Sequence, residues 1–244
     1  MMGWKWNDCI RLQFTPIEVG DKGLTMCFQA SIEVWVRLRP RTGGVIELRH
    51  DGNSKPENGH SMSFVGARVK LRQWLDTDVE AFAAMNADPK VMEFFPEPLT
   101  REQSVACLKR LQRNIDANGW GLWAVEIEGA LAGFTGLAAP AFEAHFRPCI
   151  EIGWRFHHRF WGHGYALEAS RLAVGFAFES LRLKEVVSFT ARLNERSERL
   201  MQRLGMTHSR LDDFEHPLLP VGHALRPHVL YRIQNDPRWF ETRQ

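Results

Sequence analysis

The 244-residue chain has few cysteines, and they follow no recognised pattern. The four lie far apart and form no Cys-x-x-Cys pair, which is the spacing typical of zinc sites and redox motifs. The sequence therefore predicts neither a zinc site nor a disulfide framework, and we expect a reducing compartment. The cysteines are Cys9, Cys27, Cys107 and Cys149.

Long hydrophobic runs and an excess of one charge sign are also missing. No stretch of about 18 consecutive apolar residues occurs, and the N-terminus lacks the apolar region of a signal peptide. The 31 basic and 29 acidic side chains leave a formal net charge of +2. We therefore expect a cytoplasmic protein that has neither a membrane partner nor a nucleic-acid partner.

Apolar and aromatic residues are plentiful: 44% of the chain is hydrophobic, and nine residues are tryptophan. This composition predicts a well-packed core. Residues 1–62 differ, because they end in a polar tract containing glycine and proline. Two interpretations of 1–62 stay open: a poorly structured or small appended extension, or sequence upstream of a true start at Met62. Residues 63–244 are predicted to form one domain.

From residue 64 onward, hydrophobic periodicity predicts a mixed order of strands and helices. Thr77-Asp78-Val79-Glu80 and Thr100-Arg101-Glu102-Gln103 have the capping-box pattern that opens a helix. The mixed order predicts an α+β domain and excludes a regular parallel repeat. The expected strands are 65–74, 122–127, 131–138, 150–156, 186–191, 206–211 and 228–233; the expected helices are 77–88, 100–118, 164–181 and 194–204.

The stretch 151–169, EIGWRFHHRFWGHGYALEA, changes its hydrophobic period midway. Up to Phe156 apolar residues alternate with other residues, as in a strand, and after Gly164 they recur at helical spacing. Between the two halves lies a loop with two glycines, directly before the start of a helix. Helix N-termini carry unpaired N–H groups and part of the helix dipole, and glycine allows a phosphate to approach closely. The stretch therefore predicts an anion site.

This loop and its surroundings resemble the GNAT N-acetyltransferase superfamily, and within it the branch of ribosomal-protein N-terminal acetyltransferases. The acyl-CoA signature of that superfamily, Gln/Arg-x-x-Gly-x-Gly/Ala, stands here as Arg159-Phe160-Trp161-Gly162-His163-Gly164. Glu151-Ile152-Gly153-Trp154 and Tyr165-Ala166 also look like this branch, as does Asn194-x-x-Ser197 ahead of Leu204-Gly205-Met206. The resemblance covers roughly residues 65–235.

The resemblance implies a mixed, mostly antiparallel seven-stranded sheet with splayed central strands and flanking helices. Acetyl-CoA would be the co-substrate, with its pantetheine arm along the strand 150–156 and its pyrophosphate on the N–H groups of residues 161–166. The residues that the resemblance assigns to this binding are Trp154, Arg155, Phe156, Arg159, Trp161, Gly162, His163, Gly164, Tyr165, Ala166 and Asn194.

Other sites are disfavoured by spacing. A dinucleotide fingerprint would need a third glycine where Leu167 stands, and no Gly-x-x-x-x-Gly-Lys-Ser/Thr occurs. A turn that binds nothing remains the simple alternative for the two glycines. No metal is predicted, although two groups of histidines were considered as ligands. These groups are His157, His158 and His163, and His216, His223 and His228.

Acyl transfer from a thioester to an amine needs a base for the ammonium and a proton source for the leaving thiolate. The proposed base is Glu151, on the same strand face as Gly153, with Glu97 and His216 in reserve; a purely structural role for Glu151, paired with an arginine, is equally open. An oxyanion donor is expected among the backbone N–H groups near Trp154 or Arg155. The resemblance assigns the acid to Ser197, and plain helix capping by Asn194 and Ser197 is compatible with it.

The sequence thus predicts an N-acetyltransferase that moves acetyl from acetyl-CoA to a primary amine by direct attack. The acceptor, a small molecule or a peptide or protein N-terminus, stays open. A non-catalytic acyl-CoA-binding sensor is the alternative. The protein would act as a monomer or a homodimer.

Overall fold

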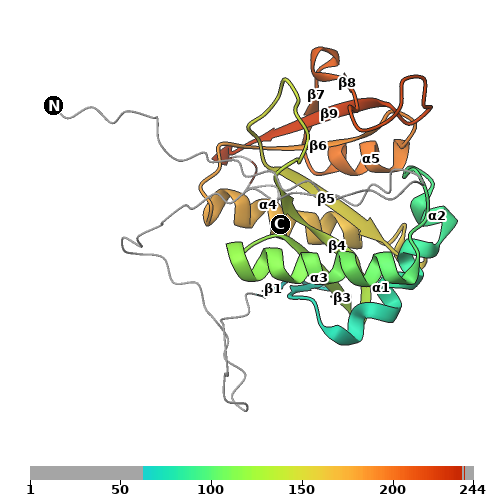
Figure 1. Cartoon of the computed structure of the whole chain (residues 1–244). Coiled ribbons are helices and arrows are strands. Elements are labelled where there is room, and N and C mark those ends of the chain that lie inside the picture. The colour runs from blue at the N-terminus through green and yellow to red at the C-terminus, as the bar shows by residue number, and fades with distance from the viewer. Residues whose placement is uncertain (1–62, 238, 240–244) are drawn as a thin grey trace.

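The computed structural model describes residues 63–237 and 239, in which one sheet carries helices on both faces (Figure 1). The two interpretations of residues 1–62 lie outside the described residues. The domain boundary at residue 63 therefore stays a prediction.

The sheet is mostly antiparallel, and its strands follow the order β1-β2-β3-β4-β5-β6-β9-β7, with β8 paired to β9. Among the described strands only β5 and β6 pair in parallel. This arrangement confirms the predicted fold class. The strands are β1 Phe64–Val65, β2 Lys70–Arg72, β3 Leu122–Ile127, β4 Ala130–Ala138, β5 Glu151–Phe156, β6 Glu185–Ala191, β7 Thr207–His208, β8 Phe214–Glu215 and β9 Pro227–Gln234.

Two short segments add to the seven predicted strands. The single strand expected over 65–74 is split, because Gly66 N–H donates to Val69 O at 2.8 Å and turns the chain between β1 and β2. The two-residue β8 interrupts the loop expected over 212–227. The strand expected over 206–211 is shorter than predicted, since Ser209 Oγ accepts from Leu211 N–H and starts a 3₁₀ turn.

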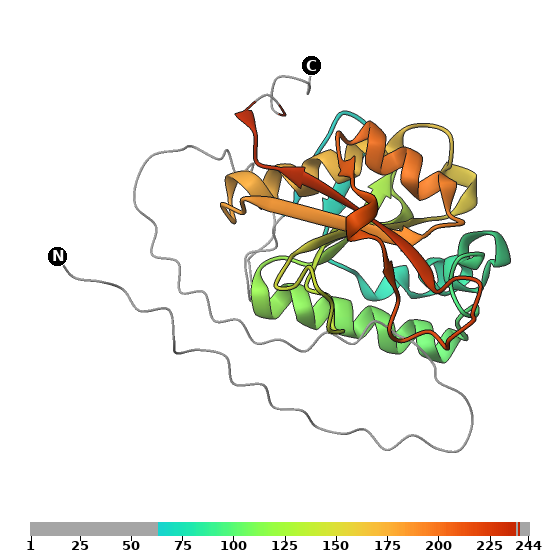
Figure 2. The ribbon, with the colours of Figure 1, turned by 90° about the horizontal axis from the view of Figure 1, so that it is seen from above.

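The α-helices divide between the two faces of the sheet, with α1, α2 and α3 on one face and α4 and α5 on the other (Figure 2). We call these the α3 face and the α4 face. The α-helices are α1 Val79–Ala87, α2 Pro89–Met92, α3 Arg101–Asn118, α4 Tyr165–Glu179 and α5 Glu195–Arg203. The 3₁₀ turns are η1 Asp76–Asp78, η2 His158–Phe160 and η3 Arg210–Asp212.

One of the two predicted capping boxes is confirmed. Thr100 and Gln103 exchange side-chain to backbone hydrogen bonds at 3.2 and 2.7 Å at the start of α3. The box predicted at Thr77 is wrong, because Asp78 takes over the turn. Its carboxylate accepts from Leu75 N–H at 2.8 Å and pairs with Arg72 at 2.7 Å, so the chain enters α1 through η1.

The strand residues alternate between the two faces, and the faces bury different cores. On the α4 face Thr135 Oγ1 of β4 lies 3.3 Å from Ser170 Oγ of α4. On the α3 face the ring of Phe134, the residue directly before Thr135 in β4, lies 6.2 Å from that of Phe82 in α1. Farther along the α3 face, a smaller cluster of buried residues forms beneath the loops 139–150 and 212–227: Phe142, Phe146, Val187 and Leu230.

Candidate functional site

A wedge opens between the two parallel strands β5 and β6. Their ladder consists of a single residue pair, Glu151 with Val187. Val187 N–H donates to Ile150 O at 3.0 Å and Ser188 Oγ to Ile152 O at 2.9 Å. Beyond that point the ladder ends, so the strands diverge toward the C-terminal end of β5. These are the splayed central strands that the sequence predicts.

The backbone of β5 presents alternate amides to the wedge. His157 N–H donates to Ala132 O of β4 at 2.9 Å, so the amides of Arg155 and Gly153 also turn toward β4. The amides of Trp154 and Phe156 consequently turn toward the wedge. Gly153, Trp154 and Arg155 are only half-buried although β5 is central in the sheet, which agrees with an opening at this point.

Arg155 does not lie where the sequence placed it. Its amide faces β4, and its guanidinium lies on the α3 face, where it donates to Asn86 Oδ1 at 2.7 Å and stacks 4.0 Å from the Phe95 ring centroid. Its amide and its guanidinium thus turn away from the wedge, and a contact of Arg155 with the co-substrate stays a prediction. Because backbone amides alternate between the two sides of a strand, Trp154 is the one of these two residues whose N–H faces the wedge.

The glycine loop joins β5 to α4 and keeps its backbone open. Gly162 and Gly164 both have φ of 80°, in the left-handed region that favours glycine, and Gly164 caps α4. A Cβ on Gly162 would meet nothing within 4 Å, so the loop is uncovered there. Trp161 anchors the loop by donating from Nε1 to Phe156 O at 3.0 Å. The first amides of α4 lack intrahelical acceptors and are open to an anion, whereas the Trp161 amide donates to His158 O at 3.1 Å. The pyrophosphate seat expected on the N–H groups of residues 161–166 stays a prediction.

Arg68 supports the glycine loop through contacts with His163 and Glu168, a role that the sequence did not reveal. Its Nε donates to Glu168 Oε2 at 2.8 Å, its amide donates to Oε1 of the same carboxylate at 2.7 Å, and Nη1 donates to His163 O at 3.0 Å. The guanidinium also lies 4.9 Å from the Tyr165 ring. Glu168, one of the few charged residues of α4, was the available signal. Arg159 of the signature is exposed and lies over the Phe160 ring at 4.8 Å.

The start of α5 faces Trp154 across the wedge. Asn194 caps the helix, because its Oδ1 accepts from Ser197 N–H at 3.2 Å. Ser197 Oγ also accepts from Trp154 Nε1 at 3.3 Å, which links α5 to β5. The capping alternative is therefore confirmed, and Ser197 nevertheless borders the wedge.

Arg196 connects α5 to two loops. Its guanidinium lies 4.7 Å from the Trp161 ring and 5.2 Å from the Phe94 ring, and it pairs with Glu93 at 2.5 Å. These contacts hold the segment after α2 beside the glycine loop. No sequence pattern predicts this bridge, since its members are far apart in the chain.

Glu151 lies on the α3 face at the closed end of the wedge. Burial alone raises its pKa to about 8, and among the described residues no arginine forms an ion pair with it. The purely structural reading of Glu151 as an arginine partner is therefore wrong. Burial, followed by the charge of Glu151, raises the pKa of the nearby Cys149 thiol to about 12. A half-buried carboxyl with a pKa near neutral pH suits proton transfer.

The two reserve bases occupy different settings. Glu97 is exposed in the loop before α3. His216 is only 6% exposed, and burial lowers its pKa to about 4. Its ring lies 4.6 Å from that of Phe142 and 4.8 Å from that of His228, so it belongs to the small cluster on the α3 face.

The histidine groups considered as metal ligands are not gathered into a ligand set. His158 pairs with Asp88 beside α2. His228 Nδ1 lies 3.1 Å from Arg226 O. Across residues 63–237 and 239, no three His, Cys, Asp or Glu side chains are grouped closely enough to hold a metal ion.

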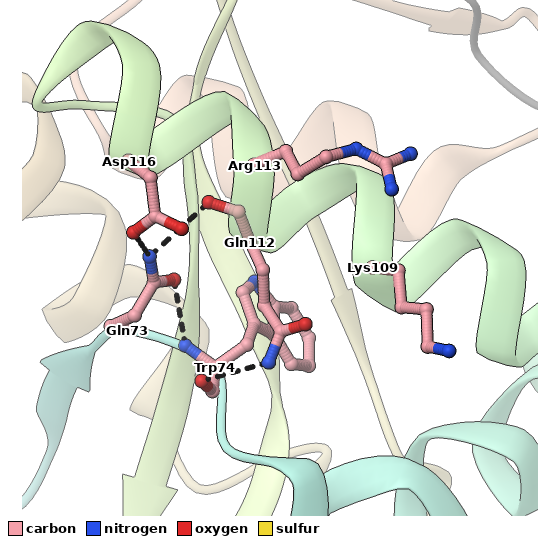
Figure 3. Close-up of a pocket in the computed structure, with 6 residues that line it drawn as sticks. All are labelled: Gln73, Trp74, Lys109, Gln112, Arg113 and Asp116. Atoms are coloured by element: carbon pink, nitrogen blue, oxygen red, sulfur yellow. Dashed lines mark hydrogen bonds between the residues drawn. The ribbon is translucent and has the colours of Figure 1, made fainter.

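A surface cavity of about 390 Å³ lies away from the wedge, between the segment after β2 and α3 (Figure 3). Several of its lining groups bond one another: Gln73 Nε2 donates to Asp116 Oδ1 at 2.7 Å, and Gln112 Nε2 donates to Trp74 O at 3.2 Å. These bonds fasten α3 to the segment after β2, which is a structural role.

The wedge, the glycine loop and the capped start of α5 all lie within the segment that the profile of a known family matches. The profile described as "Acetyltransferase (GNAT) domain" matches residues 68–207. The chain belongs to the GNAT acetyltransferase family. Members of this family transfer acetyl groups from acetyl-CoA, and the residues of this GNAT chain that bind it stay a prediction.

Similar proteins agree with this membership. The FsC-acetyl coenzyme A-N(2)-transacetylase of Aspergillus fumigatus is 35% identical over 131 residues, which are 51% of this GNAT chain and 56% of that protein. The match thus spans little more than half of the Aspergillus relative.

Solved structures share the fold. The GNAT-family acetyltransferase of Bacillus anthracis has a TM-score of 0.59 and 22% identity, over 71% of this chain and 99% of that one. RimJ of Mycobacterium smegmatis, in complex with CoA-disulfide, has a TM-score of 0.55 and 18% identity, over 68% of this chain and 81% of that one. In the portion that the structure describes, every helix is too short or too polar to span a membrane.

Proposed function

We propose that this GNAT protein acetylates a primary amine by direct attack on acetyl-CoA. The observation that carries the proposal is the β5–β6 ladder, which ends after one residue pair and leaves the Trp154 amide facing the wedge. The glycine loop follows directly after this strand. Membership in the GNAT family and the name of the Aspergillus relative, an acetyl-CoA transacetylase acting at N(2), support it.

Different residues of the wedge assist different steps of the proposed reaction. Glu151, with its pKa near 8, accepts the proton of the ammonium directly or through water. The nitrogen lone pair then forms the C–N bond, and the oxyanion accepts a hydrogen bond from the Trp154 amide. When the C–S bond breaks, the electron pair leaves on sulfur and Ser197 supplies a proton. Residues 161–166 hold the pyrophosphate, and Asn194 keeps the start of α5 in place.

The acceptor lies on the α3 face in this proposal. Gly153 opens that face of β5, because a Cβ there would meet only Leu122 Cδ2 at 3.9 Å. Glu151 is on the same side, whereas Trp154 points to the α4 face. The acceptor is a small-molecule amine or a peptide N-terminus that enters between α3 and the loops 93–98 and 212–227. The protein is proposed to act in the cytoplasm as a monomer or a homodimer.

Release of free thiol tests the proposal. Purified protein with acetyl-CoA and a panel of amines and peptides should release CoA in step with N-acetyl product. Ser197→Ala should lower kcat while the dissociation constant for acetyl-CoA changes little. Binding of acetyl-CoA without CoA release from any amine would instead support the acyl-CoA sensor.

A further inference from the structure

The hydroxyl of Ser197 accepts two hydrogen bonds, and both come from groups that can only donate. Trp154 Nε1 donates to Ser197 Oγ at 3.3 Å, and Asn194 Nδ2 donates to the same oxygen at 3.1 Å. An indole N–H has no lone pair for accepting, and neither has an amide NH₂. Neither neighbour can therefore take the serine proton.

The orientation of the Asn194 amide is fixed by its other partners. Its Oδ1 accepts from the Ser197 backbone N–H at 3.2 Å, and its Nδ2 donates to Thr190 Oγ1 at 3.0 Å. A flipped amide would face the backbone N–H with its own NH₂ group, so the orientation follows from the hydrogen bonds. The donor that faces Ser197 Oγ is thus the amide nitrogen.

A serine oxygen has two lone pairs and one proton. Because both lone pairs are engaged by donors, the O–H group is left to donate in a third direction. The two donors come from opposite sides of the wedge, Trp154 from β5 and Asn194 from the start of α5. Both Trp154 and Ser197 are half-buried, so water competes only partly for these bonds.

We propose that Trp154 is a positioning residue whose indole N–H holds the Ser197 hydroxyl as a proton donor toward the leaving sulfur. This inference rests on the proposed acetyl transfer. As the C–S bond breaks, its electron pair goes to sulfur, the serine proton moves to that sulfur, and water restores the proton to serine. Without the indole N–H, the hydroxyl can rotate and the proton is delivered less often.

The matched test is Trp154→Phe, which keeps an aromatic ring and removes the N–H. We expect kcat to fall about 5- to 10-fold, the scale of one net hydrogen bond, while the dissociation constant for acetyl-CoA stays within about twofold. The double variant Trp154→Phe/Ser197→Ala should be no slower than Ser197→Ala, because both changes remove the same function. Trp239→Phe, which removes an indole donor to Leu204 O at 3.2 Å at the opposite end of α5 from Ser197, is the control for kcat.

A second variant covers the case in which Trp154→Phe does not fold. Asn194→Asp keeps the oxygen that caps α5 but replaces the donor nitrogen with an acceptor, so the serine proton is drawn away from sulfur. It should also lower kcat without weakening acetyl-CoA binding. Wild-type kcat in Trp154→Phe or Asn194→Asp, or a loss that multiplies with that of Ser197→Ala, would overturn the inference alone. A wild-type protein that releases no CoA would overturn the proposed function and this inference together.

Discussion

The two faces of β5 differ in how deeply their side chains are buried. On the α4 face Ile152 and Phe156 are 1% and 4% exposed and belong to the main core. On the α3 face Glu151, Gly153 and Arg155 are half-buried. One six-residue strand therefore anchors the sheet with its even-numbered side chains and borders the proposed acceptor site with its odd-numbered ones.

The difference arises because side chains alternate between the two faces of β5 and because the β5–β6 ladder ends after one residue pair. Each residue of the strand sends its side chain to the face opposite that of its neighbour, so a change of one position moves a substitution from core to site. Changes on the α4 face should mainly affect stability, and changes on the α3 face should mainly affect the acceptor and the rate. Trp154 is the exception, since it lies on the α4 face but bonds Ser197.

The largest effect is expected for Glu151→Gln. Loss of a general base typically costs about 10²- to 10⁴-fold in rate, and the substitution keeps nearly the same shape. The rise of kcat/KM around pH 8 that ionisation of Glu151 gives should also disappear, which steady-state kinetics across pH would show. Glu97→Gln is the matched control, because Glu97 is the exposed reserve base. A loss confined to Glu97→Gln would move the base to the loop before α3.

Ile152→Ala should cause the largest loss of stability. Truncation of a buried isoleucine costs about 2–5 kcal/mol, and Ile152 is 1% exposed in the main core. Urea unfolding of the variant and the wild type gives the difference in the free energy of unfolding. A cost near zero would mean that the α4 face of β5 is less tightly packed than the structure shows.

Gly153→Val should weaken binding of the acceptor amine and leave stability nearly unchanged. The new side chain enters open space on the α3 face, with only Leu122 Cδ2 near its Cβ, and valine suits a strand. We expect the KM for the amine to rise about tenfold or more, whereas acetyl-CoA affinity and the melting temperature change little. Unchanged amine kinetics would place the acceptor elsewhere.

The last prediction concerns the pH dependence of stability at Glu151. Its pKa is raised from 4.5 to about 8 in the folded protein, so folding favours the protonated form. The stability that this gives is complete below about pH 4.5 and is lost as pH rises toward 8. Glu151→Gln stays neutral, so its melting temperature should exceed that of wild type by a margin that grows from pH 5 to pH 8. Parallel melting curves across this range would contradict a buried carboxyl.

The parts that the sequence predicted well are those set by local pattern. The strands 122–127 and 131–138 and the turn at Glu128-Gly129 follow from alternation and turn chemistry, and both turn residues have positive φ. The glycine loop and the caps at Thr100 and Asn194 are likewise short-range signals. Thr77 failed as a cap because Arg72 and Asp78 pair across the chain, which no local pattern reports.

The sequence by itself determined the order of the elements, the glycine loop and the acetyl-CoA family. Those features depend on residues within a few positions of each other, whose φ angles, periodicity and caps are local properties. Only the tertiary structure decided which amides of β5 face the wedge, that Glu151 has no arginine partner among residues 63–237 and 239, that Arg68 and Arg196 brace the loop, and that Trp154 bonds Ser197. Each of these depends on strand register and on contacts between residues far apart in the chain, and such contacts form only when the sheet assembles.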